Sequence, residues 1–209
     1  MSKHHVVITG TGRAGTTFLV QLYTALGLPT GFSNPFENFY ANCSAGMEWD
    51  IRRPDAPYIV KNPDLCDYLD ALLEQGDIVI DHALIPVRNL YSAAESRRDV
   101  NRRTFPHSSA TVIGVPGGLW HVVTPEHQEL VLTLQLYKVM FALTKHNVPT
   151  TLLHFPRFIN DPEYLYSKLA ATLTGIDYER FLEAFKMVVH PEWVHQFEPP
   201  RTLAAAGKS

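Results

Sequence analysis

The residues best suited to chemistry form a glycine-rich stretch near the N-terminus, Gly10-Thr11-Gly12-Arg13-Ala14-Gly15-Thr16-Thr17. The spacing of Gly10 and Gly15 is that of a Walker A phosphate-binding loop. Glycines let the backbone curl so that successive amide protons face an anion, and a following helix adds its positive end. A nucleoside-triphosphate site would continue with Lys, whereas this chain has Thr16 there and carries its positive charge at Arg13. The stretch predicts a phosphate-binding loop unlike that of a standard NTPase.

Two further cations stand at the ends of short apolar runs. Lys61 follows Tyr58-Ile59-Val60, and Arg88 follows a run that begins at Ile78. Ser96 lies eight residues after Arg88 on a predicted helix. Arg offers a planar fork of donors for phosphate, and Ser adds a neutral hydroxyl. Arg97, Arg98, Arg102 and Arg103 on the same helix are interpreted as a solvated basic face.

Strand and helix patterns alternate along the chain. β-branched and apolar runs predict strands over residues 5–8, 58–60, 78–80 (extending as far as 87) and 150–155. Helical spacing predicts helices over 17–26, 64–74, 89–102, 124–146, 161–174 and 178–188. This alternation predicts a three-layer α/β/α fold with a mainly parallel sheet, with long loops over the strand ends at about 28–57 and 103–123. Because ligands bind at the carboxyl ends of parallel strands, the loops after residues 9, 61 and 87 are expected to meet.

Length and composition bound the possibilities. The 209 residues, 45% of them apolar, fit one domain spanning 1–209, with a disordered tail at 204–209. The net charge of −3 gives no general reason to expect nucleic acid or an anionic membrane as a partner, so any anion site requires locally concentrated charge. No apolar run is long enough to span a membrane and no secretory signal is evident, so we expect a cytoplasmic protein.

The segment Gly12-Arg13-Ala14-Gly15-Thr16-Thr17-Phe18 resembles the 5′-phosphosulfate loop of sulfotransferases, which use 3′-phosphoadenosine 5′-phosphosulfate (PAPS). The resemblance implies that Thr16, Thr17 and the loop backbone at Gly12, Ala14 and Gly15 hold the 5′-phosphate. It also implies that Arg13 lies near the bridging oxygen, where charge develops on the leaving group.

Two other segments resemble the same family. Its members place an Arg at a strand end and a Ser at this spacing to bind the 3′-phosphate, which implies that role for Arg88 and Ser96. Lys61 resembles the strand-terminal Lys that approaches the sulfuryl group. The family thus implies sulfuryl transfer from PAPS to a hydroxyl or amine of a small molecule or glycan. The product nucleotide is 3′-phosphoadenosine 5′-phosphate, and this chemistry requires no metal.

The chain departs from the family pattern in two places. Pro63 occupies the position of the catalytic His of the cytosolic branch, so another base is needed. Glu37 is the predicted base, desolvated by neighbouring aromatic residues, with Glu48 and Asp50 as alternatives. The stretch Pro116-Gly117-Gly118-Leu119-Trp120 keeps the glycines and Trp of a cofactor-binding loop but lacks its basic residues.

Two rival functions remain open. A P-loop kinase would use an acidic magnesium ligand on a strand, for which Asp81 is the candidate, but Thr16 stands where its Lys belongs. The other rival is a degenerate member that binds nucleotide, or nothing, and serves as a partner-binding module. The missing basic residues around Gly117 favour this second reading. The acceptor and the oligomeric state are not predicted.

Overall fold

The computed structural model describes residues 2–41, 43–106, 115–122 and 124–198. Its main sheet has four parallel strands in the order β4-β1-β5-β6. The strands are β1 (Lys3–Ile8), β4 (Ile59–Lys61), β5 (Ile78–Val87) and β6 (Thr150–His154). All four predicted strands are therefore present, and the longer form of the third is correct.

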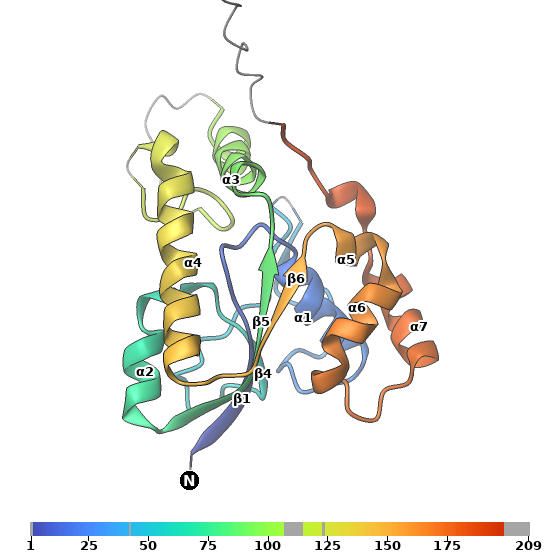
Figure 1. Ribbon diagram of the computed structural model, residues 1–209. Coiled ribbons are helices and arrows are strands. Elements are labelled where there is room, and N and C mark those ends of the chain that lie inside the picture. The colour runs from blue at the N-terminus through green and yellow to red at the C-terminus, as the bar shows by residue number, and fades with distance from the viewer. Residues whose placement is uncertain (1, 42, 107–114, 123, 199–209) are drawn as a thin grey trace, which may run out of the picture.

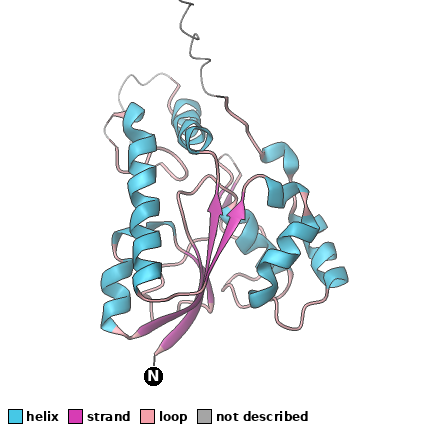
Figure 2. Ribbon diagram, viewed as in Figure 1, coloured by secondary structure: helices cyan, strands magenta, loops and turns pink. Residues whose placement is uncertain are grey.

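Helices cover both faces of this sheet, which confirms the predicted three-layer α/β/α fold (Figures 1 and 2). Successive side chains of a strand point to opposite faces, so Val7 joins one core while Val6 and Ile8 join the other. The first core includes residues of α2 (Leu69–Gln75) and α4 (Gln128–Lys145). The second includes residues of α1 (Thr16–Ala25), α6 (Pro162–Leu169) and α7 (Tyr178–Val188).

The remaining elements lie at the ends of the sheet or in its connections. Helix α3 (Leu90–Thr104) follows β5 and is capped by Asn89, whose side chain accepts a hydrogen bond from the Ser92 amide. The short helix α5 (Arg157–Asn160) follows β6. Four 3-10 turns complete the helical elements of the described chain: Pro63–Asp67, Pro125–His127, Ala170–Thr172 and Pro191–Trp193.

Some boundaries differ from the prediction. The predicted helix over 64–74 is divided at Tyr68, whose φ of −143° leaves the helical region between the first 3-10 turn and α2. The predicted loop over 28–57 contains an antiparallel pair, β2 (Phe39–Tyr40) and β3 (Ala45–Gly46), too short to give a period-two pattern. The expected tail at 204–209 and much of the loop at 103–123 fall outside the described residues. None of the described helices combines the length and apolar character needed to cross a membrane.

Candidate functional site

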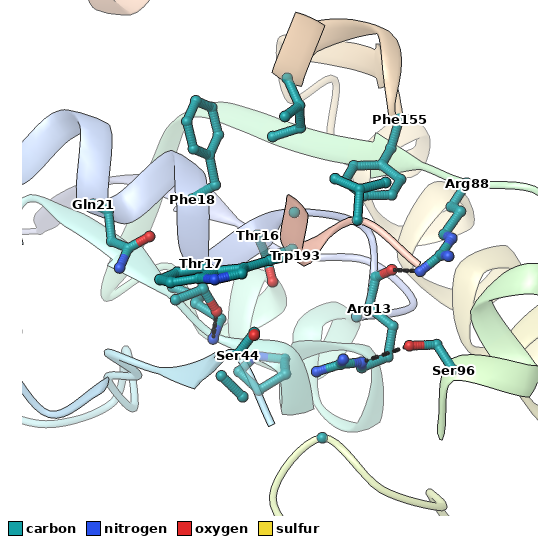
Figure 3. Close-up of a pocket in the computed structure, with 18 of the residues that line it drawn as sticks. Arg13, Thr16, Thr17, Phe18, Gln21, Ser44, Arg88, Ser96, Phe155 and Trp193 are labelled. Carbon is teal, nitrogen blue, oxygen red and sulfur yellow. Dashed lines mark hydrogen bonds between the residues drawn. The ribbon is translucent and has the colours of Figure 1, made fainter. Parts of the chain in front are cut away.

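A pocket lies at the carboxyl ends of β1, β4 and β5, where the fold predicts one (Figure 3). The glycine-rich loop (residues 10–17), the β2–β3 pair, helix α3 and the segment after α7 all contribute to its wall. Most of the predicted site residues line it: Gly12, Arg13, Gly15, Thr16, Thr17, Lys61, Arg88 and Ser96. The side chain of Ala14 is fully buried in the core instead, so the loop offers its backbone alone at that position.

The glycine-rich loop adopts left-handed backbone conformations that suit an anion site. Gly12 and Gly15 have φ values of 65° and 83°, and Arg13 between them has a φ of 54°. A side chain at Gly15 would place its Cβ 2.7 Å from a ring carbon of Phe158, so no other residue fits there without movement. Gly15 precedes α1, and no side chain caps that helix. The first amides of α1 are therefore available to an anion in the pocket.

Arg13 connects the predicted phosphate anchors to one another. Its Nε donates a 3.1 Å hydrogen bond to Ser96 Oγ, and Arg88 Nη1 donates a 2.7 Å bond to the Arg13 carbonyl (Figure 3). Arg13 also donates to the Cys43 carbonyl. Burial, followed by the charge of Arg13, lowers the pKa of Arg88 to about 10, so the guanidinium stays charged at neutral pH. Two arginines far apart in the sequence and the hydroxyl of Ser96 thus form one hydrogen-bonded cluster.

Lys61 is 3% exposed, and its ammonium group is held beside the loop. Its Nζ donates to Thr17 Oγ1 at 3.0 Å, to the Gly46 carbonyl at 2.6 Å and to Glu48 Oε1 at 3.0 Å. Burial lowers the pKa of Lys61, while the nearby Glu48 carboxylate opposes that shift. Three oxygen acceptors therefore fix one cation at the end of β4, the strand end at which the sequence predicted Lys61.

The predicted base, Glu37, is placed differently from the expectation. Its carboxylate accepts hydrogen bonds from the Ser33 amide at 2.6 Å and the Ser33 hydroxyl at 2.7 Å, and it does not line the pocket. These bonds lower the pKa of Glu37, so the expected desolvated carboxyl with a raised pKa is wrong. Asp50 is bound by Arg52 at 2.7 Å. Of the three candidate carboxylates, Glu48 alone lines the pocket.

Arg97 is a site residue that sequence reasoning assigned to a solvated face, and that interpretation is wrong. It is 2% exposed and donates to the Gly118 carbonyl at 2.7 Å and the Thr11 carbonyl at 2.6 Å. Its guanidinium carbon lies 4.9 Å from the centre of the Trp120 ring. The signal was the spacing of Ala93, Arg97 and Val100, which places all three on the buried face of α3.

The other arginines of α3 are exposed or partly exposed and lie in ion pairs. Arg98 pairs with Glu95 and Glu129, Arg102 with Glu95, and Arg103 with Asp99. The predicted basic face is therefore locally neutralised rather than a free patch of charge.

The segment after α7 forms a wall of the pocket that the sequence did not predict. His190, Trp193, Val194 and His195 line the pocket. The Trp193 ring stacks on Phe39 with a centroid distance of 5.4 Å and on His190 at 3.9 Å. Arg88 donates to the His195 carbonyl, and Ser92 Oγ donates to the Phe197 carbonyl at 2.8 Å. Such irregular segments carry no periodicity, so only the folded chain reveals their partners.

The charges of the pocket are unbalanced. Arg13, Lys61, Arg88 and Arg97 line it, whereas Glu48 is the one carboxylate among the described lining residues. The whole chain has a net charge of −3, so this is a local concentration of positive charge. The arrangement suits an anion with more than one negative group.

A scan against family models, a search of curated proteins and a search of solved structures each found no match to this chain.

Proposed function

We propose that the chain binds PAPS and transfers its sulfuryl group to a hydroxyl or amine of a small-molecule or glycan acceptor. The observation that carries the proposal is the convergence of Arg13, Lys61, Arg88 and Arg97 on a glycine-rich loop, with Glu48 as the one lining carboxylate. A chain with net negative charge that desolvates several cations together needs an anionic ligand to offset them.

The residues present fit a donor that is anionic at two ends. The loop backbone, Thr16 and Thr17 would hold the 5′-phosphate, since no side chain caps α1 and both hydroxyls line the pocket. Arg88 and Ser96 would hold the 3′-phosphate. Arg88 lies just before α3 and Ser96 lies on it, and both are hydrogen-bonded to Arg13. The donor supplies the sulfuryl group, whose bond to the 5′-phosphate breaks as a bond to the acceptor oxygen or nitrogen forms.

The chain's own residues would manage charge and the proton. Arg13 and Lys61 would stabilise the oxygens on which negative charge grows. Glu48 would take the acceptor proton, in place of Glu37, because its carboxylate lies 3.0 Å from Lys61 Nζ on the pocket wall.

The structure's geometry bears on both rival functions. Asp81, the candidate magnesium ligand of a kinase, contacts His4 at 2.8 Å and Tyr58 at 3.0 Å and does not line the pocket. The degenerate reading depended on the absent His, where Pro63 stands, and on the missing basic residues around Gly117. Arg13 and Arg97 supply that charge from elsewhere, since Arg97 donates to the Gly118 carbonyl and a Cβ at Gly117 would lie 2.9 Å from Arg13 Nη1.

Thermal unfolding with different nucleotides tests the proposal. A ligand that binds only the folded chain raises its midpoint, and we expect a rise with 3′-phosphoadenosine 5′-phosphate that exceeds the rise with ATP plus Mg²⁺. A larger rise with ATP plus Mg²⁺ would favour the kinase. No rise with either nucleotide would favour a degenerate partner-binding module that binds no nucleotide.

A further inference from the structure

We infer that Arg97 is a positioning residue for the bound anion: it fixes the glycine-rich loop to the loop at Gly117–Trp120 and adds a buried positive charge that no carboxylate of the described chain contacts. The inference rests on the proposed function only in requiring an anion in the pocket. Sulfuryl transfer itself is not needed for it.

The contacts of Arg97 join two loops that both line the pocket. One Nη donates to the Thr11 carbonyl and the other to the Gly118 carbonyl, at 2.6 and 2.7 Å. The guanidinium also packs directly against Gly12, because a Cβ at that position would lie 2.5 Å from Nη2. The position of the loop that curls around the anion therefore depends on this one side chain.

No carboxylate in the described part of the chain contacts the guanidinium of Arg97, although the Glu48 carboxylate acts on it from a distance. Its hydrogen-bond acceptors are two neutral carbonyls, and its buried Nε has no partner there. Burial, followed by the charge of Arg13, lowers the pKa of Arg97 to about 9, so the group remains charged at neutral pH. A buried charge without a partner is costly, and an anion in the adjoining pocket would offset that cost.

A merely structural role would look different. A side chain that served only to join two carbonyls needs donors and no charge, and a neutral amide would supply a donor. The buried charge of Arg97 and the charge of Arg13 repel each other while the pocket holds no anion. A bound anion would relieve that repulsion, which a neutral side chain would not create.

The test compares Arg97→Lys with Arg97→Gln, which both retain a donor and differ in charge. Arg102→Gln is the matched control, since it removes the same charge from an exposed position of α3. Calorimetry with inorganic pyrophosphate should show affinity at least about tenfold lower in Arg97→Gln, because one positive charge about 10 Å from each negative charge of the ligand contributes roughly a factor of ten at an effective dielectric constant near 20. Arg97→Lys should lose less than about threefold at neutral pH, and Arg102→Gln should match the wild type.

Equal losses in the Lys and Gln variants, or no loss in Gln, would overturn the inference. If Arg97→Gln does not fold, the pH dependence of Arg97→Lys decides instead. A buried Lys titrates at lower pH than Arg, so anion affinity should fall with rising pH in that variant before it falls in the wild type. Parallel pH profiles would contradict the role of the charge. The two proposals can fail separately. If pyrophosphate binding depends on Arg97 but the chain does not prefer a 3′-phosphorylated nucleotide, this inference stands and the proposed function is rejected.

Discussion

At the scale of single residues, the pair formed by Lys61 and Glu48 unites the two kinds of group that group transfer needs. Both residues line the pocket, but Lys61 is 3% exposed whereas the side chain of Glu48 is 48% exposed, so Glu48 is the partner that is open to solvent. An exposed carboxylate with access to an acceptor and a buried cation with access to developing charge have separate tasks.

Replacing Glu48 by Gln keeps its shape and removes its basicity. We expect Glu48→Gln to lower kcat by about 10²-fold while the dissociation constant for 3′-phosphoadenosine 5′-phosphate changes little. Steady-state kinetics with an accepted substrate and calorimetry measure the two quantities. Glu37→Gln is the matched control and should be near normal, because Glu37 binds Ser33 outside the pocket. A large loss in the Glu37 variant with none in the Glu48 variant would reverse the assignment.

The sequence identified these residues unevenly, for physical reasons. Arg13, Lys61 and Arg88 follow strands or lie in a loop of defined spacing, and local patterns determine such positions. Glu37 and Glu48 lie in a long connection without periodicity, so their order along the chain did not show which one reaches the pocket. Arg97 was misassigned because a charged residue is expected in water, although helical spacing put it on the buried face.

At the scale of elements, the segment after α7 contacts both Arg88 and the start of α3. The Arg88 guanidinium donates to the His195 carbonyl, which lies where a 3′-phosphate would compete for the same donors. Ser92, one turn into α3, holds the same segment through the Phe197 carbonyl at 2.8 Å. Binding of a 3′-phosphate should therefore move this segment and change the surroundings of Trp193.

Loosening the segment should make nucleotide binding easier. One hydrogen bond contributes about 0.5–1.5 kcal/mol, so Ser92→Ala should tighten binding of 3′-phosphoadenosine 5′-phosphate by about two- to tenfold. Ser167→Ala is the control, since that hydroxyl also donates to a carbonyl at 2.8 Å but does not line the pocket. Calorimetry measures the affinities, and Trp fluorescence follows the segment. Weaker binding in Ser92→Ala would mean that the segment contributes to the site instead of competing with the ligand.

At the scale of the whole molecule, the parallel sheet and the two helical layers followed from the alternation of strand and helix patterns, whereas the order of the strands did not. Parallel strands need crossover connections, and the helices predicted between the strands supply them. Short β-branched runs indicate the buried strands themselves. The β2–β3 pair and the segment after α7 could not be read in this way, because long-range contacts determine them. The fold was therefore more predictable than the pocket wall.

Acid should weaken the fold through His5, which is 2% exposed in β1 and donates from Nδ1 to the Pro57 carbonyl at 2.7 Å. Burial lowers the pKa of His5 below 6.5, so the unfolded chain binds the proton more readily than the folded chain. The free energy of unfolding should fall as the pH drops below about 6.5. Urea titrations at pH 7.5 and 5.5 measure this, and His5→Gln should flatten the slope more than the exposed His4→Gln. Equal slopes in both variants would assign the effect elsewhere, such as to His82, whose pKa burial also lowers.

The central claim is that the pocket recognises a nucleotide with phosphates at both the 5′ and 3′ positions. Calorimetry of 3′-phosphoadenosine 5′-phosphate against 5′-AMP tests it most directly, since the two ligands differ only in the group assigned to Arg88 and Ser96. Charge-assisted hydrogen bonds contribute about 1.5–3 kcal/mol, so the 3′-phosphate should tighten binding by at least about tenfold, and Arg88→Met should abolish the difference. Equal affinities of the wild-type chain for the two nucleotides would contradict the account.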